Sequence, residues 1–222
     1  MARIARVVAP GLPHHVTQRG NRRQETFFRE EDYVEYIRLM SEWCSCWKVE
    51  IWAYCLMPNH VHMIMVPESE EGLRRAIGEA HRRYTRLVNF REGWRGHLWQ
   101  GRFASFPMGE QYLLAAVRYV ELNPVRAGFV KHPESYKWSS AAAHISGKDD
   151  KLVTVKPLLE MVGDWKEFLA CGISEDEIGK MRCHEKTGRP LGSEGFIGKL
   201  ENTLSRILQR QKPGRKRVLQ EK

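Results

Sequence analysis

Residues 49–66 read VEIWAYCLMPNHVHMIMV, two apolar segments joined by a short turn. Residues 49–56 are rich in β-branched and aromatic side chains, which favour strands. Pro58-Asn59 is a typical turn pair, and residues 61–66 continue as a second apolar run. The stretch therefore predicts a β-hairpin.

Two histidines in the second strand of this hairpin are separated by one residue. Side chains alternate across a strand, so His60 and His62 leave the same face, whereas Val61 and Met63 point the other way, into a core. Two imidazoles side by side supply half of a divalent-metal site. The hairpin therefore predicts a metal site as well as part of a sheet.

Strands and helices are mixed along the rest of the first 150 residues. Apolar spacing predicts strands at 14–18 and 103–108, and helices at 31–47, 70–90 and 110–122. This mixture predicts an α+β fold, in which helices pack on an antiparallel sheet.

The pattern changes after about residue 150. We predict one domain over 1–150 and a small, mainly helical, basic region over 151–222, with a tail that is flexible from about residue 210. An amphipathic helix is expected around Phe196, Ile197, Leu200, Leu204 and Ile207/Leu208. It could belong to an added DNA-binding module or could cap the first domain.

Charge and composition restrict the class of protein. The formal net charge is +9, and residues 181–222 hold 11 Lys and Arg against 4 Asp and Glu, which favours a nucleic-acid partner. No apolar run approaches the roughly 18–20 residues of a membrane span, and no signal peptide is evident. The 5 cysteines are irregularly spaced, which argues against a disulfide framework. We expect a cytoplasmic protein with no membrane partner.

The helix predicted at 110–122 carries a second candidate pair. Tyr119 and Asn123 are four residues apart and share a face, about a quarter turn from the apolar stripe of Leu113, Val117 and Val120. A carboxamide together with imidazoles suits Mg²⁺ or Mn²⁺. From spacing alone, an ordinary interfacial tyrosine and a helix-end asparagine before proline explain the pair better than a site does.

Four segments together resemble a known family. They are the histidine strand at 57–64, the run VRYVELNPVRAG at 117–128, YKWSS at 136–140, and Gly101-Arg102-Phe103 preceded by Trp99-Gln100. In this order and separation they resemble the single-tyrosine HUH transposases, in particular the REP-associated tyrosine transposases. The resemblance covers about residues 3–147.

This resemblance implies a fold and residue roles. The implied fold is a ferredoxin-like sheet, the HUH endonuclease core, with the histidine strand central and the tyrosine helix packed across it. Tyr119 matches the family's nucleophile, His60 and His62 match its metal-binding histidines, and Asn123 matches the position of a third ligand. A bound divalent metal, Mg²⁺ or Mn²⁺, would assist the reaction.

The resemblance also implies a substrate and a reaction. Single-stranded DNA at hairpin-forming repeats would be cut and rejoined through a covalent 5′-phosphotyrosine, as in DNA transposition. No nucleotide cofactor is expected, because the covalent link preserves the phosphodiester energy and the sequence has no phosphate-binding loop motif. Relatives include monomers and homodimers, and both remain open here.

Basic residues beside these segments are candidates for DNA contact. Three follow the first strand, one lies in the Gly-Arg-Phe segment, and three lie in a C-terminal segment that weakly resembles a minor-groove AT-hook. They are Arg19, Arg22, Arg23, Arg102, Arg215, Lys216 and Arg217.

Several alternatives stay open. The chain could be a regulator that binds DNA hairpins without cutting them. It could instead be a metal-dependent hydrolase with a carboxylate such as Glu121, although that residue faces roughly 160° away from Tyr119 on the helix. Tyr84 is a rival nucleophile, and His14 or His15 could support the metal site from behind.

Overall fold

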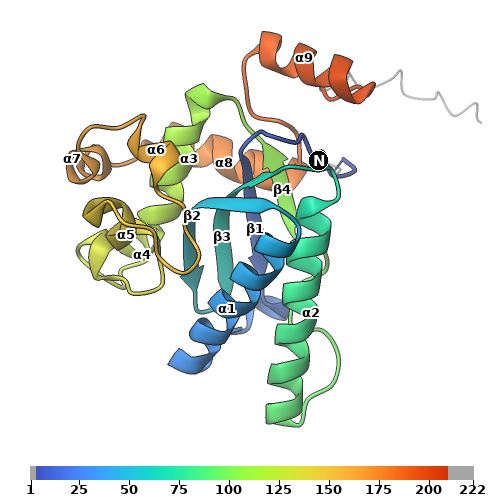
Figure 1. Cartoon of the computed structure of the whole chain (residues 1–222), viewed down its shortest axis with the longest axis vertical. Helices are drawn as coiled ribbons and strands as arrows, with labels where there is room; N and C mark the ends of the chain where they lie inside the picture. Colours follow the sequence, from blue (N-terminus) through green and yellow to red (C-terminus); the bar gives the residue numbers. More distant parts are fainter. Residues whose placement is uncertain (1–3, 210–222) are drawn as a thin grey trace, which may run out of the picture.

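A four-stranded antiparallel sheet forms the centre of the computed structural model, which describes residues 4–209 (Figure 1). The strands lie in the order β2-β3-β1-β4. Their bounds are β1 (His14–Arg19), β2 (Val49–Met57), β3 (His60–Pro67) and β4 (Ala104–Pro107). With one helix after β1 and another after β3, this is a ferredoxin-like arrangement, and the predicted α+β class is confirmed.

The predicted hairpin is β2 and β3, which pair from Val49 with Pro67 to Met57 with His60. Because β3 also pairs with β1, the histidine strand is central, as the family resemblance implied. Val61 and Met63 are fully buried in the core on one face of the sheet. His60 and His62 therefore face the other side, as their spacing predicted.

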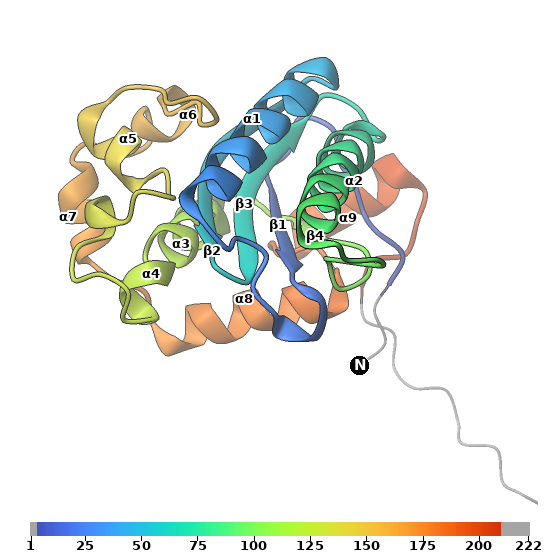
Figure 2. The same ribbon diagram turned by 90° about the horizontal axis from the view of Figure 1, so that it is seen from below.

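Two long helices cover that first face, α1 (Glu30–Cys46) and α2 (Gly72–Glu92) (Figure 2). The helix α1 begins with three acidic residues, which its positive N-terminal dipole favours. The helix α2 ends at Gly93, whose φ of 67° suits glycine. Their apolar stripes bury residues such as Tyr36, Met40, Ile77 and Tyr84 against the sheet.

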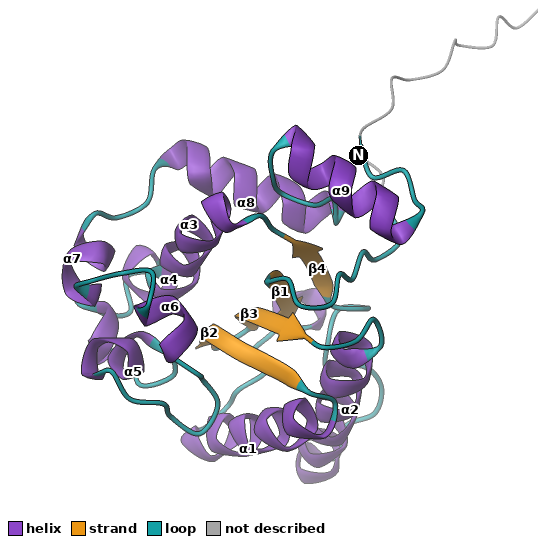
Figure 3. Ribbon diagram, turned by 45° about the horizontal axis from the view of Figure 1, so that its top comes forward, coloured by secondary structure: helices purple, strands orange, loops and turns teal. Residues whose placement is uncertain are grey.

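The second face of the sheet carries α3 (Glu110–Glu121) and α8 (Glu175–Thr187), which contact each other (Figures 2 and 3). The stripe of Leu113, Val117 and Val120 is fully buried or nearly so, as predicted. The helix α8 also contacts β4. This face is where the histidines point, so the C-terminal region reaches the candidate site.

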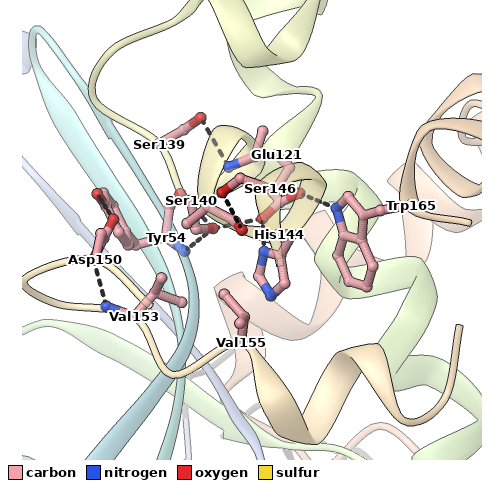
Figure 4. A network of polar contacts seen from close by, with 12 residues as sticks. Tyr54, Glu121, Ser139, Ser140, His144, Ser146, Asp150, Val153, Val155 and Trp165 are labelled. Atoms are coloured by element: carbon pink, nitrogen blue, oxygen red, sulfur yellow. Dashed lines mark hydrogen bonds and ion pairs between the residues drawn. The ribbon is translucent and has the colours of Figure 1, made fainter. Parts of the chain in front are cut away.

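A buried carboxylate ties α3 to the segments that follow it (Figure 4). Glu121 accepts hydrogen bonds from Ser140 at 2.5 Å and from Trp165 Nε1 at 2.9 Å, and it lies 2.7 Å from His144 Nδ1. These partners lie on or next to α5 (Ala141–Ser146) and α7 (Trp165–Ala170). Short helical turns complete this region: η2 (Pro133–Ser135) and α6 (Lys156–Leu159).

The last described helix, α9 (Glu194–Leu204), packs on the N-terminal segment. It is shorter than predicted, because Ser205 takes a left-handed conformation and ends the helix before Ile207 and Leu208. Leu200 meets Val7 and Ala9 in a small separate apolar cluster, which also takes in Phe196, Ile197 and Leu204. This contact favours the capping role over an independent module. The division into domains at about residue 150 stays a prediction, and the expected flexible tail lies outside the described residues.

Helix lengths bear on the membrane question. Within residues 4–209, none of the helices combines the length and the apolar character that crossing a bilayer requires.

Candidate active site

A cleft of about 680 Å³ opens on the second face of the sheet. All four residues predicted for the metal site and the nucleophile, His60, His62, Tyr119 and Asn123, line it. The other lining residues are Thr17, Arg19, Gln100, Arg126, Ala127, Arg182, Glu185 and Lys186. Four cationic side chains against one carboxylate give the cleft a positive balance, which suits a phosphate backbone.

The aromatic rings of the predicted residues lie close together. The ring centroids of His60 and His62 are 5.0 Å apart, and those of His62 and Tyr119 are 5.4 Å apart, with planes nearly perpendicular in both pairs. The tyrosine helix therefore brings its phenol to the histidine pair of the neighbouring strand.

Burial keeps both histidines neutral. It lowers the pKa of His60 to about 4, with help from the positive charge of Arg19. Burial also holds the pKa of His62 well below its usual value, and the neighbouring His60 and His15 act in the same direction. A neutral imidazole offers a nitrogen lone pair, which a metal ion requires.

Opposing influences act on the Tyr119 hydroxyl. Burial and the negative charge of Glu185 raise the pKa of Tyr119, whereas Arg126 and Arg182 lower it. The guanidinium of Arg126 lies 4.3 Å from the centroid of the tyrosine ring. The net result is a raised pKa, so the phenol is protonated at neutral pH, the form in which a tyrosine is a weak nucleophile.

Asn123 follows a break in the tyrosine helix. After α3 ends at Glu121, a short helix, α4 (Asn123–Arg126), begins with Asn123 and Pro124. Asn123 is buried at the edge of the cleft. Within residues 4–209 its carboxamide makes no hydrogen bond and can take a ligand.

The sequence indicated His15 only as one of two possible supporting residues, and the structure distinguishes it from His14. His15 Nε2 lies 3.0 Å from His62 Nδ1, whereas His14 bonds to Leu12 and Ala9. Thr17 pairs with His62 across the strands, so His15 lies diagonally on the same face of the sheet.

Three cleft residues on α8, Arg182, Glu185 and Lys186, were missed by the sequence analysis. Glu185 Oε1 lies 3.7 Å from Nδ1 of both His15 and His62. Burial raises the pKa of Glu185 to about 7, although Arg19, Tyr119, Arg182 and Arg126 lower it.

A signal for Glu185 was present in the sequence. It continues the buried stripe of Ile178 and Met181 at helical spacing, so it is a carboxylate on an apolar face. The helix that carries it begins with a capping box of Ser174 and Glu177 and ends at Gly188.

The donor set of this cleft fits a divalent cation. Ligand atoms of His15, His62 and Glu185 lie within 4.8 Å of one another, and His60 and Asn123 line the same cleft. In the described part of the chain, the buried atoms His15 Nδ1 and Glu185 Oε1 have no hydrogen-bond partner. Neutral imidazoles, a carboxylate and a carboxamide are ligands that Mg²⁺ or Mn²⁺ accepts.

The predicted DNA-contact residues fall in different places. Arg19 lines the cleft. Arg22 and Arg23 are exposed in η1 (Asn21–Arg23), and Arg102 is exposed outside the cleft lining. The basic residues at 215–217 and the AT-hook-like segment lie outside the described residues. Their contacts with DNA stay predictions.

Two rival residues lie away from the cleft lining. Tyr84 is fully buried among the core residues of the first face, where its hydroxyl donates to the Thr26 carbonyl at 2.6 Å. Glu121 is fully buried in its network with Ser140, His144 and Trp165. Neither side chain is placed to act on a substrate in the cleft.

Comparisons with known proteins agree with this fold. A REP-associated tyrosine transposase from Haemophilus influenzae is 26% identical over an alignment of 121 residues, and the match covers 49% of this chain and 69% of that protein. A solved structure of a REP-associated tyrosine transposase bound to a REP hairpin has a TM-score of 0.57 at 21% identity, covering 69% of this chain and 92% of its own.

The family model described as "Transposase IS200 like" matches residues 10–123. This segment is just over half of the chain and contains the histidine pair, Tyr119 and Asn123. The chain therefore belongs to the IS200-like transposase family.

Proposed function

We propose that this protein cuts and rejoins single-stranded DNA at hairpin-forming repeats, with Tyr119 as the nucleophile. His60, His62 and Asn123 would hold Mg²⁺ or Mn²⁺ beside it, and the protein would act in the cytoplasm. The observation that carries the proposal is the meeting of the phenol and the histidine pair in one cationic cleft.

The proposed reaction is a transesterification. The Tyr119 oxygen bonds to the scissile phosphorus, and the bond from phosphorus to the 3′-oxygen breaks. This leaves a 5′-phosphotyrosine and a free 3′-hydroxyl, and the proton lost by the phenol is balanced by the one that the leaving oxygen gains. A divalent cation bound in the cleft would polarise the scissile phosphate and help to orient it. Attack by another 3′-hydroxyl rejoins the strand.

The protein's own side chains would position the DNA. Arg19, Arg126 and Arg182 reach the cleft from three different segments, so they can contact successive phosphates. The proposal of a hairpin substrate is supported by the relative of similar fold, whose structure contains a REP hairpin. Because the phenol and the histidines of one chain already meet, we propose that a monomer is sufficient for cleavage.

The test is covalent capture. The full-length protein is incubated with end-labelled hairpin DNA and Mn²⁺, and a protease-sensitive DNA adduct is sought on a denaturing gel. The adduct should form with the wild type and with Tyr84→Phe, and it should be absent with Tyr119→Phe. An adduct that persists in Tyr119→Phe would show that Tyr119 is not the nucleophile.

Two other functions give different results in the same assay. A hairpin-binding regulator would bind the DNA tightly and leave it intact. A metal-dependent hydrolase would release cut DNA without an adduct. If the protein were a hydrolase, its carboxylate would be Glu185, which lines the cleft, rather than Glu121, which does not. For a hydrolase, Glu185→Gln would abolish cutting while Tyr119→Phe would not.

A further inference from the structure

We propose that His15 and Glu185 form a relay that holds His62 in one tautomer, with its Nε2 lone pair directed to a metal ion. His15 and Glu185 would act as positioning residues behind the proposed metal site. The inference rests on the proposed function, because it assumes that His60 and His62 bind the cation.

The contact between the two imidazoles carries the argument. His15 Nε2 and His62 Nδ1 are 3.0 Å apart, both side chains are buried, and the ring planes differ by 13°. The ring centroids are 5.2 Å apart, which fits an N–H···N hydrogen bond lying nearly in the plane of both rings. Nδ1 of His62 is therefore engaged by His15, which leaves Nε2 as its metal-binding atom.

The proton positions follow from this contact. A neutral imidazole carries one N–H. If Nε2 of His62 binds a cation, its proton lies on Nδ1 and is donated to His15 Nε2. The proton of His15 must then lie on its own Nδ1, which is 3.7 Å from Glu185 Oε1.

This arrangement explains two buried atoms that otherwise have no partner. His15 Nδ1 and Glu185 Oε1 lack hydrogen bonds within residues 4–209, and the relay pairs a donor with an acceptor. The distance of 3.7 Å is longer than a hydrogen bond. The relay therefore requires a small movement of the Glu185 side chain, which is 20% exposed.

His60 is held in the same tautomer by a different neighbour. Its Nδ1 lies 2.6 Å from the side-chain oxygen of Asn59, and the amide nitrogen of Asn59 donates to the Arg23 carbonyl at 3.2 Å. The second bond fixes which end of the amide faces the histidine, so Nδ1 of His60 is a donor. Both histidines then present Nε2, the common arrangement when the other nitrogen is oriented from behind.

The test measures metal binding rather than cleavage. Mn²⁺ affinity of the full-length protein is measured by electron paramagnetic resonance without DNA. His15→Phe keeps a ring but removes the acceptor, and we expect it to weaken Mn²⁺ binding about 10- to 100-fold. His15→Gln, which can still accept from His62 Nδ1, should recover most of the affinity. His14→Phe is the matched control, equally buried on the adjacent position, and should stay within about twofold of the wild type.

Glu185 provides a second variant at a partly exposed position. Glu185→Ala should weaken Mn²⁺ binding less than His15→Phe does. Replacing the exposed Glu175 on the same helix by alanine should have no effect.

Nitrogen-15 spectra of the metal-free protein should show His62 protonated at Nδ1 in the wild type and a mixture of tautomers in His15→Phe. If Glu185 ligates the cation directly, Glu185→Ala will reduce affinity as much as His62→Ala and leave the His62 tautomer unchanged, which overturns the relay.

Failure of the relay and failure of the proposed function look different. If His62→Ala binds Mn²⁺ as well as the wild type does, the proposed metal site is wrong. If His62→Ala loses Mn²⁺ but His15→Phe binds it normally, the metal site stands and only the relay is wrong.

Discussion

The guanidinium of Arg126 lies over the ring of Tyr119, 4.3 Å from its centroid, and both residues line the same cleft. Arg126 is on α4, so the break after α3 turns its side chain back over the tyrosine. Burial lowers the pKa of Arg126, but it remains a cation at neutral pH. A positive charge here lowers the pKa of Tyr119 and lies in the lining of the cleft proposed to bind DNA.

Arg126→Gln should therefore slow adduct formation, by on the order of 10²-fold, because a charge that stabilises both the phenolate and the phosphate is lost. Single-turnover rates on labelled hairpin DNA measure this effect. Arg74→Gln is the control, since Arg74 is exposed on α2 and paired with Glu71. An unchanged rate in Arg126→Gln would exclude a catalytic contribution from this arginine.

Arg182 on α8 should contribute to DNA affinity. Its replacement by alanine should weaken hairpin binding and reduce the slope of log affinity against log salt by about 0.7 to 0.9, the value for one lost phosphate contact. Fluorescence anisotropy at several salt concentrations measures the slope. Arg82→Ala removes an exposed arginine from α2 on the other face and should leave the slope unchanged. Equal slopes for both variants would place the DNA elsewhere.

The parts of the fold that sequence predicted were those set by local patterns. The hairpin at 49–66 and the helix with Leu113, Val117 and Val120 follow from side-chain periodicity, which a short window contains. The shared face of His60 and His62 follows from the same alternation. Residues 14–18 were likewise recognised as a strand, although its central place in the sheet depends on pairing that no local pattern encodes.

The parts that sequence missed depend on packing between distant segments. Glu185 is 66 residues after Tyr119 in the sequence and reaches the cleft only because α8 packs on β4 and α3. The choice between His14 and His15 also required tertiary structure, since both are buried and only the face of β1 distinguishes them. The family resemblance covered about residues 3–147 and therefore excluded α8.

Glu121→Ala should destabilise the protein by about 3–5 kcal/mol. The substitution removes a fully buried carboxylate and leaves Ser140, His144 and Trp165 without their partner. Urea unfolding followed by circular dichroism measures the loss. The control is Glu50→Ala, because Glu50 accepts a bond from Trp52 Nε1 at 2.8 Å on the surface, and it should cost less than about 1 kcal/mol. Similar losses for the two variants would contradict a structural role for the Glu121 network.

Stability should fall as the pH drops below about 6.5, the ordinary pKa of histidine. Burial lowers the pKa of His81 to about 3, and its Nε2 lies 2.9 Å from the Tyr36 hydroxyl. Between these two pKa values the unfolded chain binds a proton that the folded protein does not. For this group the free energy of unfolding therefore falls by about 1.4 kcal/mol for each unit by which the pH drops. His14, whose pKa burial lowers to about 4, acts in the same direction.

His81→Gln isolates this contribution, because glutamine can keep a bond to Tyr36 but does not titrate. Between pH 7 and pH 5 the free energy of unfolding of the wild type should fall by about 2 kcal/mol more than that of His81→Gln. The difference is the contribution of His81, which is lost over about 1.5 pH units below pH 6.5. Urea unfolding at both pH values measures the difference, and His97→Gln, which removes an exposed histidine, is the matched control. If the pH dependence of His81→Gln equals that of the wild type, His81 takes up the same number of protons in the folded and the unfolded protein between pH 7 and pH 5, and burial does not lower its pKa.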